Sequence, residues 1–343
     1  MRRLLNTLFV TSEDIYLSLD GENVVANREH TVVARYPLHT LSAILSFSYP
    51  GASPALMGAC AQRGISLSFC TPRGKFLARV TGEANGNVLL RRAQYRVADD
   101  PVQSCAVARA MVFGKVYNAR WSIERTRRDH SLRVDTGRLE AVSGQLKALL
   151  PQLLDETDLD SLRGLEGAGA TAYFSVFEQL ILGDSALFQF HTRSRRPPLD
   201  PVNALLSFSY SLLSHDCAWA LESVGLDSYV GFLHRDRPGR SSLALDLMEE
   251  FRPCIADRFV LTCINNRIFQ KSDFEYRENG GVFLSESGRR IFLQRWQERK
   301  KDTLTHPFLG EKVPWGLVPY LQALLLARYL RNDLDAYPPF LWK

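Results

Sequence analysis

The chain has 343 residues, 45% of them hydrophobic, which is enough to build a sizeable core and two domains. Its 42 basic and 37 acidic side chains give a formal net charge of +5, too small an excess to establish a nucleic-acid partner by itself. Six cysteines occur without a CxxC pair. This usage excludes a typical zinc site and predicts buried thiols in a reduced, cytoplasmic protein.

Neither end of the chain predicts secretion or a membrane span. The basic start is followed by an apolar run that breaks at Asn6, unlike a signal peptide. The most apolar late stretch, residues 315–330, contains Pro319, Gln322 and Arg328. It predicts a buried helix that begins near Pro319.

Residues 1–84 predict a β-rich N-terminal domain. An apolar stretch, Ile15–Leu19, runs into Asp20-Gly21, a strong signal for a hairpin turn. One helix is expected over residues 55–62. Further strands are expected at residues 31–36, 65–70 and 76–80, with a turn at 71–74 between the last two.

The pattern changes at residues 85–87, and residues 85–343 predict a larger, mostly α-helical catalytic domain. The fold class is therefore α+β. A helix should begin at Asp99-Asp100-Pro101, where an acidic cap precedes proline. The tail, residues 333–343, contains two prolines and is expected to be loose. Apolar residues recur at three- and four-residue intervals up to about residue 330, with breaks at Gly137, Pro151, 183–196, Gly225, 235–240 and 280–281.

Glu166 is the first candidate for a site. On a helix it shares a face with Ala170, Tyr173, Phe174 and Phe177. A carboxylate on an apolar face is costly unless a cation neutralises it. The alternative is a glutamate in the first helical turn, where the helix dipole favours it.

His234 follows the apolar stretch 226–233 and opens a basic loop. An imidazole there can bind a metal, although a helix cap or a pH-sensitive surface group is the alternative. Asp246, Glu249 and Glu250 come next, at i, i+3 and i+4 of a predicted helix. A solvated acidic face is their alternative, but the apolar stripe at 243, 247 and 251 places them beside the core.

Together, a glutamate, a histidine and a Glu/Asp ligand favour Mg²⁺ or Mn²⁺ over zinc. Three protein ligands leave positions open for water and a phosphate oxygen. Four basic clusters accompany them. One cluster, Arg235, Arg237 and Arg240, lies between two candidate ligands and suits a nucleic-acid backbone. A cluster at 289–301 fits a solvated face, and the others are 115–133 and 191–196.

Several motifs together resemble the CRISPR-associated adaptation integrase, the spacer-acquisition endonuclease family, over nearly the whole chain. The opening, residues 4–10 with 17–23, resembles the subtype I-C branch of this family. Five further stretches carry the resemblance: Lys115–Arg120, Gly164–Gly167 with Ala172–Phe174, Pro201–Phe208, Gly231–His234 and Leu243–Pro253.

The resemblance implies that Glu166 and His234 are metal ligands. It maps Glu249 onto the third ligand and Asp246 onto an additional acidic residue that supports the site. Glu250 stays the alternative to Glu249. The resemblance also implies a homodimer formed largely through the N-terminal domains. Two such dimers would flank a dimer of a small ferredoxin-like subunit in a hetero-hexamer on double-stranded DNA, with an accessory processing nuclease as a further candidate partner.

The expected function is therefore a metal-dependent DNA endonuclease and integrase, which inserts short duplexes into a CRISPR repeat array by transesterification. Five arginines are expected to position phosphates without reading sequence: Arg195, Arg196, Arg235, Arg237 and Arg240. One alternative is a structure-selective nuclease for branched DNA, which would use the same site. The other is a non-catalytic DNA-binding scaffold with a degenerate site.

Overall fold

The computed structural model describes residues 7–41, 43–71, 76–80, 82, 88–183 and 186–343. Contacts between Cα atoms divide the chain into two compact units. The first contains residues 1–85, 284–302 and 314–317, and the second contains 86–283, 303–313 and 318–343. The predicted division after residue 84 stays a prediction. Residues 1–6, most of the turn expected at 71–74 and the change expected at 85–87 lie outside the described residues.

The first unit contains an antiparallel sheet of three strands, β2 (Tyr16–Asp20), β3 (Asn23–Arg28) and β4 (Thr31–Pro37). The pairing of Asp20 with Asn23 closes a tight turn between β2 and β3. Gly21 in that turn has a φ of 56°, which glycine adopts without strain. The predicted hairpin is therefore confirmed.

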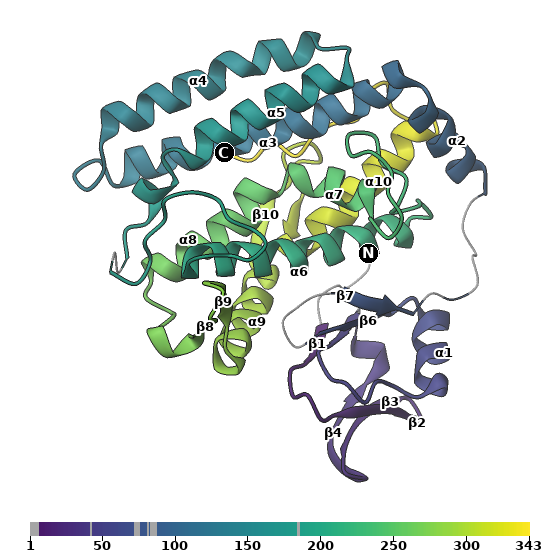
Figure 1. Cartoon of the computed structure of the whole chain (residues 1–343). Helices are drawn as coiled ribbons and strands as arrows, with labels where there is room; N and C mark the ends of the chain where they lie inside the picture. Colours follow the sequence, from purple (N-terminus) through teal and green to yellow (C-terminus); the bar gives the residue numbers. More distant parts are fainter. Residues whose placement is uncertain (1–6, 42, 72–75, 81, 83–87, 184–185) are drawn as a thin grey trace. The chain divides into compact units, whose positions relative to one another are not determined.

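A second sheet, in the order β1-β5-β6-β7, follows in the same unit (Figure 1). Strand β5 (Ala43–Ser46) pairs in parallel with both β1 (Thr7–Val10) and β6 (Ser66–Cys70), while β7 (Phe76–Arg79) returns antiparallel. Parallel neighbours need a crossover, and helix α1 (Pro54–Arg63) supplies it between β5 and β6.

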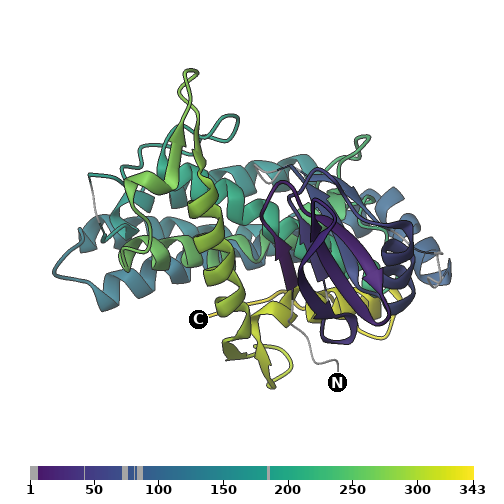
Figure 2. The same ribbon diagram turned by 90° about the horizontal axis from the view of Figure 1, so that it is seen from below.

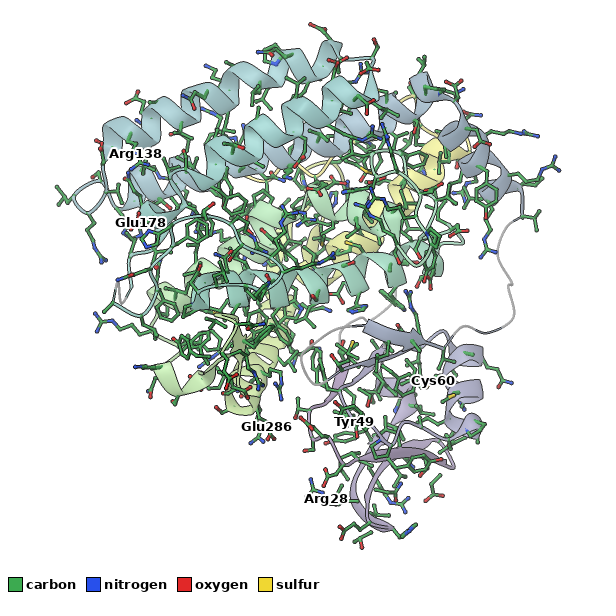
Figure 3. All side chains as sticks on the ribbon, viewed as in Figure 1. Arg28, Tyr49, Cys60, Arg138, Glu178 and Glu286 are labelled. Atoms are coloured by element: carbon green, nitrogen blue, oxygen red, sulfur yellow. The ribbon has the colours of Figure 1, made fainter. Side chains whose placement is uncertain are left out.

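The core of the first unit lies between its strands and α1. Leu17, Val24, Leu56 and Leu67 are fully buried there. Cys60, on α1, lies among them (Figure 3), and all six cysteines are buried thiols as predicted. Figure 2 shows the strands of this unit from below, in purple.

Three long helices lie side by side in the second unit: α3 (Pro101–Asp129), α4 (Thr136–Asp155) and α5 (Leu159–Phe174) (Figure 1). The carboxylate of Asp100 accepts hydrogen bonds from the first backbone N–H groups of α3, and Pro101 follows. This helix start was predicted from the sequence.

A second group of helices packs against α3. Its centre is α6 (Pro201–Ser223), which contacts α7 (Ser242–Glu249) and α10 (Val318–Leu330). The chain then passes from α7 into a π-helical segment, η3 (Arg252–Asp257), and continues as α8 (Arg258–Asn265). π-helical turns are rare, and they occur frequently at functional sites.

The remaining elements are short or peripheral. They are η1 (Leu38–Thr40), α2 (Val88–Asp99), η2 (Phe177–Leu180), η4 (Lys271–Asp273), β8 (Phe274–Tyr276), β9 (Val282–Leu284), α9 (Glu286–Lys301), β10 (Thr303–Thr305), β11 (Lys312–Pro314) and η5 (Trp315–Leu317).

In the described part of the chain no helix is long and apolar enough to cross a membrane.

Two local predictions are wrong. The helix α4 does not break at Pro151 but runs on to Asp155, and Gly137 lies inside its first turn. The tail is not loose, since Tyr337 is 4% exposed and Phe340 is fully buried. In both cases packing against other helices outweighs the local preference of proline.

Candidate functional site

Glu166 lies in the middle of α5, seven residues after the helix begins at Leu159. It is therefore not a first-turn glutamate. A Cβ built on Gly169 would lie 3.1 Å from Cγ2 of Val116, so the small residues of α5 allow it to approach α3 closely. This approach brings the Glu166 carboxylate into an ion pair with the Lys115 ammonium of α3.

Lys115 connects two carboxylates. Its Nζ contacts Glu166 Oε1 and lies 2.7 Å from Glu249 Oε2, at the end of α7. Arg252 approaches the same Glu249 oxygen, with its Nε at 3.1 Å. The Glu249 side chain is 5% exposed, so the predicted alternative of a solvated acidic face is wrong for this residue. We define Lys115, Glu166, His234, Glu249 and Arg252 as the candidate catalytic cluster, or catalytic cluster for short.

His234 is held by Asp246, one helical turn before Glu249. Its Nδ1 lies 2.5 Å from Asp246 Oδ1, and its backbone N–H donates to the same oxygen at 3.0 Å. The other oxygen, Oδ2, accepts the N–H groups of Phe232 and Leu233 at 2.6 and 2.9 Å. Because Nδ1 is engaged with a buried carboxylate, Nε2 is the ring nitrogen that is left for a ligand.

The loop that carries His234 needs glycine at residue 231. A Cβ there would lie 2.8 Å from both Asp246 Oδ2 and Ser242 Cβ. The close approach lets the backbone of residues 232–234 wrap around the Asp246 carboxylate. Asp246 therefore positions the histidine.

The cluster is strongly polarised. Burial by itself would raise the pKa of Glu249, but Arg252, Lys115 and His234 outweigh burial and lower this pKa to about 2. Burial opposes the charge of Lys115 as well, yet Glu249 and Glu166 raise its pKa above the usual value. Glu249 is therefore an anion, and Lys115 a cation, over the physiological pH range.

Glu250 has a different environment. Its side chain is fully buried and accepts hydrogen bonds from the Tyr337 hydroxyl, the Phe340 backbone N–H and Gln322 Nε2, the last at 3.2 Å. Burial raises the pKa of Glu250 to about 8, although these three donors lower it in part. Glu250 therefore anchors the C-terminal tail, whereas Glu249 belongs to the catalytic cluster.

The donors of the cluster fit a hard divalent cation. Glu166 and Glu249 offer carboxylate oxygens, and His234 offers Nε2. Glu249 Oε2 is buried and has ion pairs but no hydrogen bond of normal geometry within the described residues, so it is available to a cation. Among those same residues, no three His, Cys, Asp or Glu side chains stand grouped around one metal position. The Lys115 ammonium lies between the two carboxylates instead.

Solvent reaches the cluster at two side chains. Glu166 and His234 are 25% and 22% exposed, whereas Glu249 is almost covered. A substrate would therefore approach from the side of α5 and the loop of His234.

The arginines expected to bind nucleic acid are at the surface. Arg195, Arg196, Arg235 and Arg237 are exposed and Arg240 is half-buried. Arg235 donates to the exposed carboxylate of Asp160 at 3.0 Å, a pair that water weakens. Their contact with DNA stays a prediction.

Two members of the cluster were not predicted as site residues. Lys115 belongs to a basic cluster and to a family motif, but nothing in the sequence around it indicates that it contacts residues 166 and 249. Arg252 follows Glu249 by three residues, the spacing of helical ion pairs, and this could have indicated their contact.

Known proteins resemble this chain in sequence and in fold. The family model described as CRISPR associated protein Cas1 matches residues 8–298. The chain is 48% identical to a CRISPR-associated endonuclease Cas1 of Chlorobaculum tepidum and 50% identical to one of Rhodospirillum rubrum, over the full length of each protein. Its fold resembles that of a casposase bound to its integration product, with a TM-score of 0.83, 22% identity and coverage of 99% and 95% of the two chains.

Proposed function

This chain belongs to the Cas1 family of CRISPR-associated proteins, and from that premise we propose that it inserts short DNA duplexes into a CRISPR repeat array. The reaction would be a transesterification. A 3′-hydroxyl of the incoming duplex attacks a phosphodiester at the repeat boundary, a new O–P bond forms, and the bond to the leaving oxygen breaks. The attacking hydroxyl loses its proton, and the leaving oxygen takes up a proton to become the new 3′-hydroxyl. A bound Mg²⁺ or Mn²⁺ ion would supply Lewis-acid stabilisation of the charge that develops.

The observation that carries this proposal is the convergence of three distant segments on one charged site. Lys115 contacts Glu166 and Glu249, and His234 is near enough to lower the Glu249 pKa. We propose that Glu166, Glu249 and Nε2 of His234 hold the cation after Lys115 moves aside. Asp246 keeps Nε2 directed at the site through Nδ1.

The surrounding cations would hold the substrate. Arg235, Arg237 and Arg240 follow His234 directly, so they suit phosphates of the strand that reaches the cluster. Arg195 and Arg196 would act in the same way from the loop before α6. We also propose the homodimer, and the hetero-hexamer with a small ferredoxin-like subunit, as the working assembly. The subtype I-C assignment stays part of this proposal.

The test is integration of a labelled duplex into a repeat plasmid, with the partner subunit and Mn²⁺. Glu166→Gln and His234→Asn should each lower the rate by about 10²-fold or more, because each removes a ligand. Glu178→Gln is the matched control, since Glu178 is an exposed glutamate shortly after α5 (Figure 3). Wild-type rates in both ligand variants would refute the proposal.

The two other functions make different predictions for the same protein. A structure-selective nuclease would use water as the acceptor and would cut a branched fork faster than it integrates. A DNA-binding scaffold would bind DNA but show no saturable, His234-dependent binding of Mn²⁺ in calorimetry. The ordered pair of Asp246 and His234 favours a working site over a degenerate one.

A further inference from the structure

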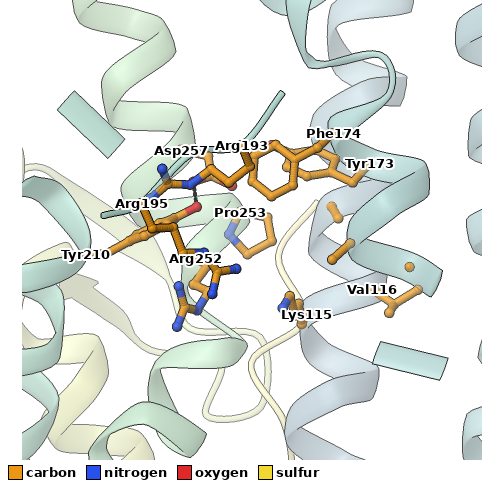
Figure 4. Close-up of a pocket in the computed structure, with 13 residues that line it drawn as sticks. Lys115, Val116, Tyr173, Phe174, Arg193, Arg195, Tyr210, Arg252, Pro253 and Asp257 are labelled. Carbon is orange, nitrogen blue, oxygen red and sulfur yellow. Dashed lines mark hydrogen bonds between the residues drawn. The ribbon is translucent and has the colours of Figure 1, made fainter. Parts of the chain in front are cut away.

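A small cavity lies beside the catalytic cluster and shares Lys115 and Arg252 with it (Figure 4). Its volume is about 30 Å³, room for about two water molecules. Helices α3, α5 and α6 and the π-helix η3 supply its walls. Neither the metal ligands nor the surface arginines of the basic loop after His234 account for this space.

The cavity is positively charged. Its lining contains four basic side chains, Lys115, Arg193, Arg195 and Arg252, and one carboxyl, Asp257. The carboxyl already accepts a hydrogen bond from the Tyr210 hydroxyl at 2.6 Å. Lys115 and Arg252 are already paired with Glu166 and Glu249 outside the lining, so the positive charge in excess comes from Arg193 and Arg195, and it favours an anion.

Arg252 has hydrogen-bonding capacity to spare. Its Nε lies against Glu249, and its guanidinium stacks over the Tyr210 ring at 4.6 Å. Its two Nη groups donate no hydrogen bond to a described residue, and the side chain is 16% exposed. Arg195 likewise has no hydrogen bond or ion pair within the described ranges. Both guanidiniums can therefore take a ligand without giving up a structural contact.

A residue with a buried hydroxyl also lines this space. Tyr173 lines the cavity and is 3% exposed, yet its Oη makes no hydrogen bond of normal geometry with the part of the chain that the structure describes. The Asp257 carboxyl is near enough to raise the Tyr173 pKa, after burial itself, without reaching that geometry. A buried hydroxyl without a partner costs about 1–3 kcal/mol, which a bound acceptor would offset.

Arg193 has a different part. Its guanidinium donates to Asn203 Oδ1 at 2.7 Å and to Ser207 Oγ at 3.1 Å. These contacts fix the loop before α6 on the helix itself. Arg193 therefore holds the wall of the cavity in place, whereas Arg195, Arg252 and Tyr173 present the donors that a ligand can use.

We infer that this cavity binds one phosphodiester group of the DNA strand that enters the catalytic cluster, next to the bond that reacts. The inference rests on the proposed function and adds a substrate subsite to it. A phosphodiester carries the charge and the acceptor oxygens that Arg195, Arg252 and the Tyr173 hydroxyl match. A nucleobase is excluded by size, because the cavity holds only about two waters.

The apolar part of the lining strengthens this binding. Val116, Phe174 and Pro253 keep water away from one side of the cavity. A charge-assisted hydrogen bond is stronger in such surroundings than at an open surface. Because Arg252 also contacts Glu249, a phosphate held here would be placed at a fixed position relative to the catalytic carboxylates.

The experiment measures binding of a fluorescent duplex with single-stranded 3′ ends, by anisotropy, to the full chain without divalent metal. A neutral methylphosphonate replaces one phosphate at a time near the 3′ end. In the wild type, one linkage should cost about tenfold in affinity. In Arg195→Gln and in Arg252→Lys, the same replacement should lower the affinity less than about twofold, because the arginine that contacts this phosphate is already absent.

Two further variants separate the subsite from folding and from overall charge. Tyr173→Phe should lower the affinity for DNA about fivefold without lowering the unfolding temperature. The hydroxyl that it removes makes no hydrogen bond of normal geometry with a described residue. Arg290→Gln removes an equal charge from an exposed i,i+4 pair on α9 and should leave the methylphosphonate penalty at its wild-type size.

An equal penalty in the wild type and in Arg195→Gln and Arg252→Lys would overturn the subsite while leaving integration, tested separately, untouched. Loss of integration in the wild type would instead remove the proposed function. Binding of a mononucleotide that depends on Arg195 and Tyr173, without any methylphosphonate coupling, would also overturn the assignment to a DNA strand.

Discussion

Glu249 and Glu250 are neighbours in the sequence but face opposite sides of the end of α7. The Glu249 carboxylate contacts Lys115 at 2.7 Å and Arg252 at 3.1 Å. The Glu250 carboxyl instead accepts hydrogen bonds from Tyr337 and from the backbone of Phe340. One glutamate is thus directed at the catalytic cluster and the other at the C-terminal tail.

Substituting each glutamate by glutamine should therefore have opposite results. Burial raises the pKa of Glu250 to about 8, so a neutral glutamine is a close substitute at neutral pH. In Glu250→Gln, the amide oxygen can still accept from the Phe340 N–H, while the Tyr337 hydroxyl, which donates to Glu250 in the wild type, must turn to accept from the amide NH₂. We expect integration within about twofold of wild type for Glu250→Gln and a loss of about 10²-fold for Glu249→Gln. Equal losses in the two variants would contradict the division of roles.

Lys115 should compete with a divalent cation for the two carboxylates. In Lys115→Met the side chain keeps its length but not its charge, so the protein without metal should lose about 3 kcal/mol of unfolding free energy. Calorimetry should show Mn²⁺ binding roughly tenfold tighter, because the repelling ammonium is gone. Lys147→Met, an exposed lysine on α4, is the control. Unchanged Mn²⁺ affinity in Lys115→Met would refute the competition.

Local signals predicted much of the fold. Asp20-Gly21 marked a hairpin, and Asp100-Pro101 marked the start of α3, because each acts through its own neighbours. The break predicted at Pro151 is wrong because buried Leu146 and Leu153 keep α4 helical on both sides of the proline. The parallel pairing of β1 with β5 depends on residues more than 30 positions apart and has no local signal.

The sequence predicted the candidate ligands but not the residues that surround them, and the binding of a metal by these ligands stays a prediction. The spacing of Asp246, Glu249 and Glu250 fits one helical face and cannot decide between the two glutamates. The C-terminal tail distinguishes the two glutamates, because Tyr337 and the backbone of Phe340 donate hydrogen bonds to Glu250. Lys115 precedes Glu249 by 134 residues, so their ion pair follows from packing of α3 against α7 and not from a motif.

Asp246 should matter for structure as well as for the metal. In Asp246→Asn, the amide NH₂ must face either the N–H groups of Phe232 and Leu233 or the side that holds His234. Either orientation opposes two donors, so we expect a loss of about 1–3 kcal/mol of unfolding free energy. Mn²⁺ affinity should fall about 10- to 100-fold. Asp236→Asn, in the same loop but exposed, should change neither quantity.

The C-terminal tail should contribute to global stability. Phe340 is fully buried and packs its ring against Phe251 at a centroid distance of 5.9 Å. Phe340→Ala should therefore cost about 3–5 kcal/mol in urea unfolding. Phe308→Ala, at a residue 52% exposed, should cost much less. Equal costs in the two variants would show that the tail is loose after all.

Asp257 should make stability fall as the pH rises through the weakly acidic range. Burial raises its pKa from 3.8 to about 6, although the Tyr210 hydrogen bond lowers it in part. Since the folded pKa lies above the unfolded one, the stabilising contribution is complete below about pH 4 and is lost as the pH rises through about 6. The cations and hydroxyls that face this carboxyl are Tyr210, Arg252, Arg193, Lys115 and Tyr173.

The measurement is the unfolding free energy of the wild type and of Asp257→Asn between pH 4.5 and 8. The asparagine variant cannot ionise at this position, so its unfolding free energy should rise relative to that of the wild type by about 2 kcal/mol over the range. Most of the gain should appear between pH 5 and 7, at roughly one pH unit on either side of the folded pKa. A constant difference across the range would mean that Asp257 keeps one protonation state in the folded protein.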